Sequence, residues 1–564
     1  MLSGAEETRV KAALRLSALW MFAVAVSAAM VSHPLAQTRP APRQPVVTAR
    51  TTPPLVVLIV ADQFRADYIQ RYGGMWTKGL RRLVDTGAYF PLAAYPYTST
   101  FTCPGHTTIG TGAFPRTHGM IGNDWFDRAT QRVTACTNDP TAISIPYGGR
   151  AGTEKHSARW MTTNTLADEL RAQSTTPAHV MSLSLKPRAA IGMVGHGGDL
   201  VLWEEEGATW ASSSAFSSAP DSALNAWITA HPIDAEYGRV WDRALPPNKY
   251  FFTDSGLGEP ATADWPNVFP HRLTRPNGRP DQVFYDTWQR SPFSDEMLAD
   301  LAIATSGTLG HGAGTDMLAV SFSALDLIGH RWGPTSHEVQ DTLVRLDAEI
   351  GRLLDTLDAR VGAGNYVVAF SADHGTALIP EQMTAIGLDA GRFVTSALNA
   401  RLTDAWKTAT SDGSNPIASG GVNMYFTPSA LATIRSSRAV REAITAAALS
   451  APGIAYAYWG DDLATGVSGD DPMKRAAILN YVPDRSPDLM MIPKPYWMSA
   501  ATGSTHGTPN VYDQRVPVIL MGWGIKPGRY LTTATPADIA PTLALLAGIT
   551  LPRAEGRVLG EAIR

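Results

Sequence analysis

Leu55-Val-Val-Leu-Ile-Val-Ala-Asp62 is the stretch of sequence that decides the fold. No polar residue interrupts its apolar run before the closing aspartate, which is typical of a strand buried on both faces of a sheet. Further runs of branched apolar residues follow, and helical patterns alternate with them. This alternation predicts an α/β fold, with a mostly parallel central sheet flanked by helices. The further runs are Val180–Leu185, Met317–Ser323, Tyr366–Ser371 and Val516–Met521.

Two helices are indicated by the residues at their ends. Ser336 suits the N-cap of a helix whose apolar positions recur at three- and four-residue spacing from Val339 to Leu357. Near the end of the chain, Thr535 and Pro536 suit an N-cap and a first helical position, and Gly548 suits the stop of that helix.

Two stretches break the alternation of strands and helices. Residues from about 195 to 292 are rich in Trp, Pro and Gly, and residues from about 379 to 497 contain mixed short elements. We expect one catalytic domain over residues 55–564, in which these two insertions cap the active edge of the sheet. Trp203, Trp210 and Trp227 of the first insertion could either select a leaving group or merely cap the site.

The N-terminus has the pattern of a secretory signal peptide. Arg9, Lys11 and Arg15 precede an apolar run over residues 16–31 that ends among small residues. The alternative is a retained membrane anchor, but the run is short for a hydrocarbon core of about 30 Å and serines dilute it. We therefore expect a signal peptide over residues 1–36, a Pro-rich linker over residues 37–54, and an exported protein, periplasmic or secreted, without a stable membrane span.

The composition excludes several classes of protein. The 564-residue chain is 44% hydrophobic and 17% charged with a net charge of -4, so it lacks the basic excess of nucleic-acid binders. Its only cysteines, Cys103 and Cys136, cannot build a disulfide scaffold or a four-thiolate zinc module. In an oxidising compartment these two could pair, but two buried free thiols fit the sequence equally well.

Carboxylates and histidines follow several of the expected strands. Ligands of open parallel sheets bind beyond the carboxyl ends of the strands. Taken singly, these residues also fit turn caps, surface pairs or loop histidines. Together, three Asp and three His provide the nitrogen and oxygen ligands that zinc accepts, and two such ions can clamp both oxygens of a phosphoryl transfer. The six residues are Asp62, Asp326, His330, Asp373, His374 and His506.

A nucleophile candidate lies in Tyr97-Thr-Ser-Thr-Phe-Thr-Cys-Pro-Gly-His106. Its Pro and Gly suggest a turn into a helix that begins near Thr107, and the free N–H groups of a helix N-terminus suit a phosphoryl oxygen. Local grounds do not distinguish Thr98, Thr100 and Thr102, and each also fits a structural turn threonine.

From Leu55 to the C-terminus the sequence resembles the alkaline phosphatase superfamily. Within that superfamily it is similar to the threonine-nucleophile monoesterases of the PafA and PhoK type. The motifs that carry the resemblance are Thr102-Cys-Pro-Gly-His106, Gly110-Thr-Gly112, His118-Gly119, Gly122-Asn-Asp-Trp125, Ser184-Leu-Lys-Pro-Arg188, Asp326-xx-Gly-His330-xx-Gly-Pro334, Ala372-Asp-His-Gly375 and His506-Gly507.

The resemblance implies two Zn²⁺ ions per chain and phosphate monoesters as small-molecule substrates. One zinc would be bound by Asp326, His330 and His506, and the other by Asp62, Asp373 and His374. Thr102 would be the nucleophile, with its hydroxyl ionised on the second zinc, and it would form a phosphothreonine intermediate. Asn123, Lys186 and Arg188 would bind the phosphate oxygens.

Three other functions compete with this hypothesis. Sister phosphodiesterases of the superfamily keep the six metal ligands but lack the Lys-x-Arg pair, so solvated Lys186 and Arg188 would favour a diesterase. A catalytically silent metal- or phosphate-binding protein is disfavoured because every catalytic position is filled. A sulfatase is disfavoured, since Cys103-Pro-Gly-His lacks the Pro spacing and the Arg of the Cys-x-Pro-x-Arg pattern.

An acidic stretch over residues 461–471 is a further candidate metal site. Asp461, Asp462, Asp470 and Asp471 could hold a structural Ca²⁺, although a solvated acidic loop is the commoner arrangement. We expect a monomer that needs no nucleic acid.

Overall fold

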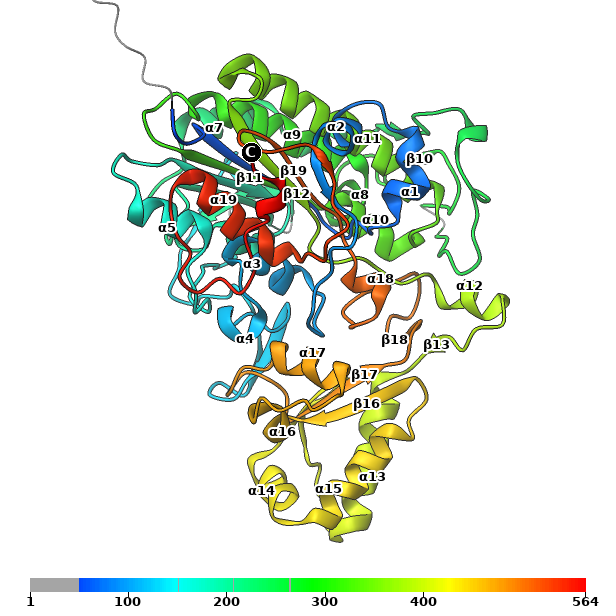
Figure 1. The fold of residues 1–564 in the computed structure, drawn as a ribbon. Helices are drawn as coiled ribbons and strands as arrows, with labels where there is room; N and C mark the ends of the chain where they lie inside the picture. Colours follow the sequence, from blue (N-terminus) through cyan, green and yellow to red (C-terminus); the bar gives the residue numbers. More distant parts are fainter. Residues whose placement is uncertain (1–49, 151, 206, 263–264) are drawn as a thin grey trace, which may run out of the picture. The chain divides into compact units, whose positions relative to one another are not determined.

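Strand β1 (Leu55–Ala61) lies inside a ten-stranded sheet in a computed structural model of the chain, shown in Figure 1. The structure describes residues 50–150, 152–205, 207–262 and 265–564. The expected signal peptide and residues 37–49 of the expected linker therefore lie outside the described residues. One compact unit spans Thr51–Arg564 and contains all the elements below.

The central strands of the sheet are parallel, as expected from the apolar runs. Strand β1 pairs in parallel with β11 and β12, and β6 and β7 continue the parallel arrangement beyond β11. Antiparallel pairs occur toward both edges, where β19 joins β12 and β8 joins β7. The strand order is β20-β2-β19-β12-β1-β11-β6-β7-β8-β5. The named strands are β2 (Ala88–Phe90), β5 (Ser144–Pro146), β6 (Val180–Ser184), β7 (Leu200–Glu205), β8 (Thr209–Ser213), β11 (Asp316–Phe322), β12 (Tyr366–Ser371), β19 (Val518–Gly522) and β20 (Gly528–Arg529).

One strand begins later than expected. The apolar run starts at Val516, but β19 begins at Val518. Pro517 has no N–H to donate to a ladder, and its carbonyl accepts a hydrogen bond from the Ser371 hydroxyl instead. The proline therefore delays the start of the strand.

Both faces of the sheet are covered by helices. Alternate residues of β1 belong to two different apolar cores: Val57 and Ile59 lie in one, and Val56 and Leu58 lie in the other. The first face packs against α2 (Gly79–Thr86), α9 (Pro292–Thr305) and α11 (His337–Leu357). The second face packs against α3 (Thr102–Thr111), α5 (Leu166–Gln173), α6 (Pro187–Val194) and α19 (Ile539–Ala547).

The two expected helices are confirmed, with one adjustment. The Ser336 hydroxyl accepts from the Val339 N–H at the start of α11. Thr535 forms a capping box, but the first turn after it is a 3₁₀ turn that precedes α19. Gly548 ends α19 in the left-handed conformation, with φ of 73°.

The first expected insertion is partly built into the sheet. Its strands β7 and β8 extend the central sheet, so Trp203 and Trp210 are buried in the core. Residues 379–497 contain a separate four-stranded sheet with its own apolar core, drawn in yellow and orange in Figure 1. Its main elements are α13 (Thr395–Thr410), β14 (Ile417–Ser419), β15 (Asn423–Phe426), α14 (Pro428–Ser436), α15 (Arg438–Leu449), β16 (Ile454–Trp459) and β17 (Leu489–Pro493). Among the described residues, no helix combines the length and apolar character that crossing a membrane requires.

Cys103 and Cys136 form a disulfide, with their Cα atoms 6.7 Å apart. The bond joins the first turn of α3 to the end of the β3–β4 hairpin (Asp124–Asp127 and Arg132–Ala135). It thereby closes a loop that contains Asn123.

We expect replacement of both cysteines by alanine to lower the free energy of unfolding by about 2–4 kcal/mol, because the unfolded chain regains the entropy of the open loop. Denaturant titration of the variant and the wild-type protein measures the difference. As a control, thiol titration of denatured, unreduced wild-type protein should find no free thiol. Two free thiols, or an unchanged unfolding midpoint, would contradict the disulfide.

Candidate active site

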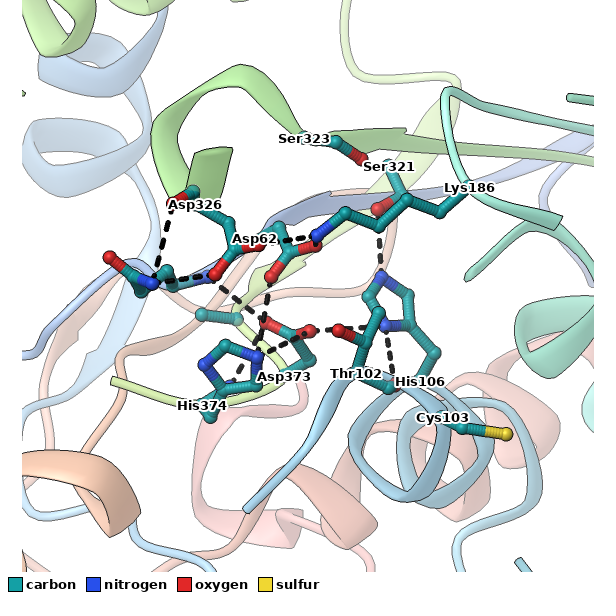
Figure 2. Close-up of polar contacts among 12 residues, drawn as sticks. Asp62, Thr102, Cys103, His106, Lys186, Ser321, Ser323, Asp326, Asp373 and His374 are labelled. Atoms are coloured by element: carbon teal, nitrogen blue, oxygen red, sulfur yellow. Dashed lines mark hydrogen bonds and ion pairs between the residues drawn. The ribbon is translucent and has the colours of Figure 1, made fainter. Parts of the chain in front are cut away.

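The six expected ligands lie together at the carboxyl edge of the central strands, and Figure 2 shows four of them. Asp62 directly follows β1, and Asp373 and His374 lie in the loop after β12. Asp326 and His330 lie one turn apart on α10 (Ala324–Trp332), the helix that follows β11. The topology of the sheet therefore brings together residues that are far apart in the sequence. His506 joins them from the loop between β18 (Trp497–Met498) and α18 (Val511–Gln514).

The ligands form two groups, each close enough to hold one metal ion. In the first group, His330 Nε2 lies 3.2 Å from Asp326 Oδ1, and His506 Nε2 lies 3.6 Å from the same oxygen. In the second group, His374 Nε2 lies 3.4 Å from Asp62 Oδ1 and 3.2 Å from Asp373 Oδ2. The His374 and His506 rings stack with centroids 3.5 Å apart, so the two groups adjoin.

Backbone carbonyls orient all three histidines in the same way. His330 Nδ1 lies 2.9 Å from the Ser504 carbonyl, and His374 Nδ1 lies 2.9 Å from the Gly375 carbonyl. His506 Nδ1 lies 2.8 Å from the Thr100 carbonyl. Each Nδ1–H therefore donates a hydrogen bond to a backbone carbonyl. Each Nε2 faces the carboxylates and has a lone pair that can bind a metal ion.

Burial shifts the pKa values of the ligand side chains. Burial, together with the nearby Asp326 and Asp373 carboxylates, raises the pKa of Asp62 well above its ordinary range. Burial lowers the pKa of His506 well below its ordinary value, and His374 and His330 act in the same direction. The imidazole is therefore neutral, which is the form that binds metals.

Buried polar atoms without hydrogen-bond partners gather in the second group. They are Asp62 Oδ1, Asp373 Oδ2 and His374 Nε2. In the first group, His330 Nε2 and His506 Nε2 lie 3.2 Å apart, so both could bind one ion. The unpartnered atoms of the second group are unfavourable for the bare side chains, whereas a divalent cation would satisfy them. The residues therefore fit two metal ions.

Thr102 is the first residue of α3, so this helix begins five residues before the expected Thr107. The reason is that Pro104 is tolerated inside the first turn, where its missing N–H has no intrahelical acceptor. Thr102 is fully buried, and its hydroxyl has no hydrogen-bond partner. By contrast, the Thr100 hydroxyl donates to the Thr508 carbonyl at 2.9 Å. The structure thus distinguishes Thr102 from Thr100, which the sequence did not.

Lys186 lies between the two groups of ligands. Only 6% of it is exposed, and its ammonium pairs with both Asp62 and Asp326, as Figure 2 shows for Asp62. Burial alone would lower the pKa of Lys186, but the carboxylates of Asp326 and Asp62 hold the pKa above its ordinary value. The side chain is therefore a buried cation rather than a solvated surface charge.

Arg188 and Asn123 share a pocket with Lys186. Arg188 is half-buried in α6, and its Nε has no hydrogen-bond partner. Asn123 Oδ1 accepts from the Cys103 N–H at 2.9 Å, so its amide side chain is tied to the first turn of α3. The three expected phosphate-binding residues are thus brought together, and Asn123 connects them to the residue that follows Thr102.

Two residues of the site were given no role by the sequence analysis. His106 Nδ1 lies 2.9 Å from the Thr102 carbonyl and 3.3 Å from Asp373 Oδ2, and its Nε2 lies 2.7 Å from the Ser321 hydroxyl. Gln63 donates from its backbone N–H to Asp373 and from its side chain to Asp326. Their positions gave a signal: His106 lies one helical turn after Thr102, and Gln63 follows a strand-end carboxylate.

The expected calcium loop has other partners. Asp461 pairs with Arg435 at 2.8 Å and Asp462 pairs with Arg441 at 2.8 Å. Asp471 caps α17 (Pro472–Asn480). These carboxylates are therefore engaged in ion pairs with arginines and in a helix cap.

Comparison with known proteins agrees with this geometry. The sequence profile of the type I phosphodiesterase / nucleotide pyrophosphatase family matches residues 56–515. Alkaline phosphatase PafA of Elizabethkingia meningoseptica is 30% identical over 530 residues, which cover 91% of this chain and 94% of its own. Alkaline phosphatase PhoK of Sphingomonas sp is 30% identical over 91% of each chain. The crystal structure of wild-type PafA superposes with a TM-score of 0.81 at 29% identity, covering 92% of this chain and 100% of that chain.

The chain therefore belongs to the type I phosphodiesterase / nucleotide pyrophosphatase family and is homologous to alkaline phosphatases of the PafA and PhoK type. The resemblance and the fold class expected from the sequence are both confirmed. The protein is a metal-dependent phosphoesterase.

We expect Gly105→Ala to disrupt the site. A Cβ at this position would lie 2.3 Å from the Asp373 carbonyl oxygen and 2.6 Å from Asp373 Cβ, so either α3 or the ligand loop must shift. A displacement of about 1 Å in a catalytic group costs roughly 100-fold in rate. The measurement is kcat/KM together with metal content. Gly74→Ala is the matched control, because a Cβ there meets nothing within 4 Å. Unchanged activity in Gly105→Ala would contradict the close contact.

Proposed function

We propose that this member of the family is an exported alkaline phosphatase. It hydrolyses phosphate monoesters, uses two zinc ions, forms a phosphothreonine at Thr102 and releases inorganic phosphate. The observation that carries the proposal is the buried Lys186, which lies between the two ligand groups with Arg188 and Asn123 beside it.

Asp326, His330 and His506 would hold one zinc, and Asp62, Asp373 and His374 the other. The mixed carboxylate and imidazole ligands suit zinc. When bound, two such ions supply Lewis-acid stabilisation of the attacking and leaving oxygens.

Thr102 supplies the nucleophile and its surroundings. Its hydroxyl is buried, so water has little access to it, and His106 contacts both the Thr102 carbonyl and Asp373. At the start of α3, Pro104 has no N–H and the Cys103 N–H donates to Asn123, which leaves the Thr102 N–H to donate to a phosphoryl oxygen. Attack by the Thr102 oxygen releases the alcohol, and water then hydrolyses the phosphothreonine and restores the hydroxyl. Two in-line displacements give net retention at phosphorus.

His106 positions this nucleophile. Its Nδ1–H lies between the Thr102 carbonyl and Asp373, and its other nitrogen accepts from the Ser321 hydroxyl on β11. The first turn of α3 is thereby fixed to a ligand loop and to the central sheet. Such support holds a catalytic constellation within the narrow limits that phosphoryl transfer needs.

Lys186, Arg188 and Asn123 favour a monoester over a diester. A monoester dianion carries an extra charged oxygen, and a buried ammonium and a guanidinium match that charge. The alternative of a diesterase required the two basic residues to be solvated, but Lys186 is buried and Arg188 is half-buried. The relatives that bear the name alkaline phosphatase support the same choice.

The disulfide supports export. Disulfides persist in oxidising compartments, such as the periplasm or the exterior of the cell. The signal peptide at residues 1–36, the capping role of residues 379–497 and the monomeric state belong to the same proposal.

We expect Thr102→Ala to abolish the phosphoenzyme and to reduce turnover by several orders of magnitude, with zinc content unchanged. Mass spectrometry of protein quenched in acid during turnover detects the phosphothreonine. Thr102→Ser should restore a phosphorylated residue. Thr100→Ala is the matched control, since the Thr100 hydroxyl already bonds the Thr508 carbonyl. A phosphoenzyme in Thr102→Ala would reject Thr102 as the nucleophile.

We expect Lys186→Met combined with Arg188→Ala to cost monoesters far more than diesters, because the charged contacts serve the extra anionic oxygen. Loss of one charge-assisted contact is worth about 1.5–3 kcal/mol. The measurement is kcat/KM for 4-nitrophenyl phosphate and for bis(4-nitrophenyl) phosphate. Arg401→Ala removes an exposed arginine from α13 and serves as the control. Equal losses on both substrates would reject the assigned roles and favour the diesterase.

A further inference from the structure

An apolar cavity of about 150 Å³ adjoins the metal-ligand group of Asp326, His330 and His506. His506 itself lines it, as does Phe101, the residue before Thr102. The Phe101 and His506 rings meet edge to face, with centroids 5.5 Å apart. The cavity therefore adjoins the candidate active site at His506 and Phe101.

Residues 379–497 and the segment just after them supply most of the apolar lining. Thioether and aromatic side chains from β17, β18 and the loop at Phe393 meet the segment around Thr98 and Phe101. Met490 of β17 contacts this segment directly: the Thr98 hydroxyl lies 3.7 Å from the Met490 sulfur. The main apolar residues are Phe393, Met490, Ile492, Trp497 and Met498.

The cavity lies on the side where the leaving group must depart. His106 contacts both Thr102 and Asp373, so the nucleophile belongs to the side of the Asp62, Asp373 and His374 group. Attacking and leaving oxygens of a phosphoryl transfer lie roughly in line, on opposite sides of phosphorus. The leaving oxygen is then directed toward the group that contains His506, where the cavity opens.

The charge of the lining restricts what the cavity accepts. Neither lysine nor arginine is among its lining residues, so a leaving group with a second phosphate or a carboxylate finds no cation there. Its one carboxyl is Asp513, which accepts from the Thr508 N–H at 2.9 Å and from the Thr508 hydroxyl at 2.6 Å. Burial raises the pKa of Asp513 to about 8, so near neutral pH it gives little attraction to a cationic leaving group.

We propose that this cavity binds the leaving alcohol and selects uncharged, apolar or aromatic alcohols. The proposal rests on the phosphomonoesterase function and adds its substrate class. The tryptophans of the first insertion then have no part in selecting the leaving group. Trp203 and Trp210 are buried in the central sheet, and Trp227 stacks on His231 with centroids 4.1 Å apart.

The first test compares benzyl phosphate with methyl phosphate, whose leaving alcohols are similarly basic. In the zinc-loaded wild-type protein we expect kcat/KM to be at least about tenfold higher for benzyl phosphate, as for an alcohol that fills an apolar pocket. Met490→Gln should lower this ratio at least about threefold and leave methyl phosphate within about twofold of wild type. Tyr456→Ala removes an exposed aromatic from β16 of the same sheet and should leave the ratio unchanged.

Calorimetric binding of phenylphosphonate and methylphosphonate tests the cavity without turnover. The wild-type protein should bind phenylphosphonate more tightly, and Met490→Gln should remove most of that preference. Equal affinities, or a preference that Met490→Gln leaves intact, would overturn the proposal. Absence of monoester turnover with a retained phenyl preference would instead reject the phosphomonoesterase function and keep the apolar cavity.

Discussion

The structure of the site depends on the repulsion among three buried carboxylates. Asp62, Asp326 and Asp373 meet where three parallel strands end, and burial raises the cost of their shared charge. One buried ammonium, that of Lys186, pairs with two of them, which leaves excess negative charge. The Nδ1–H groups of the three histidines donate to backbone carbonyls, so their Nε2 atoms face the carboxylates and are available to a metal ion. Divalent cations would balance this charge, and the family of the chain is one of metal-dependent phosphoesterases.

Different parts of the chain contribute the two halves of substrate recognition. The central sheet and its helices provide the groups that meet the phosphoryl end, namely the ligands, the N-terminus of α3 and the donors around Lys186. Residues 379–497, with a core of their own, contribute most of the apolar wall that faces His506. The chemistry can therefore stay constant while this second region changes the alcohol that is accepted. The close contact between Gly105 and Asp373 shows how closely α3 must approach the loop of Asp373 and His374 to form the phosphoryl-binding part of the site.

Local sequence patterns predicted the parts of the fold that rest on local physics. The apolar run of β1, the three- and four-residue spacing of α11 and the turn that separates Asp326 from His330 all follow from period and length. The start of α3 was placed too late, because a proline in a first turn resembles a helix breaker.

The sequence could not place β7 and β8 in the sheet, since pairing with β6 is a non-local contact. The roles of His106 and Gln63, and the meeting of Met490 with Thr98, likewise depend on residues distant in the chain. The assignment of roles to the six ligands came from a family resemblance rather than from spacing alone.

The most direct test of this account is the metal content of the active protein. After dialysis against trace zinc, elemental analysis should find two zinc ions per chain, one for each ligand group. Chelation should abolish hydrolysis of 4-nitrophenyl phosphate and lower the thermal midpoint, and added zinc should restore both. Full turnover by a folded chain that retains less than one divalent ion would contradict the account at its foundation, because the three carboxylates would then coexist without the cations that it requires.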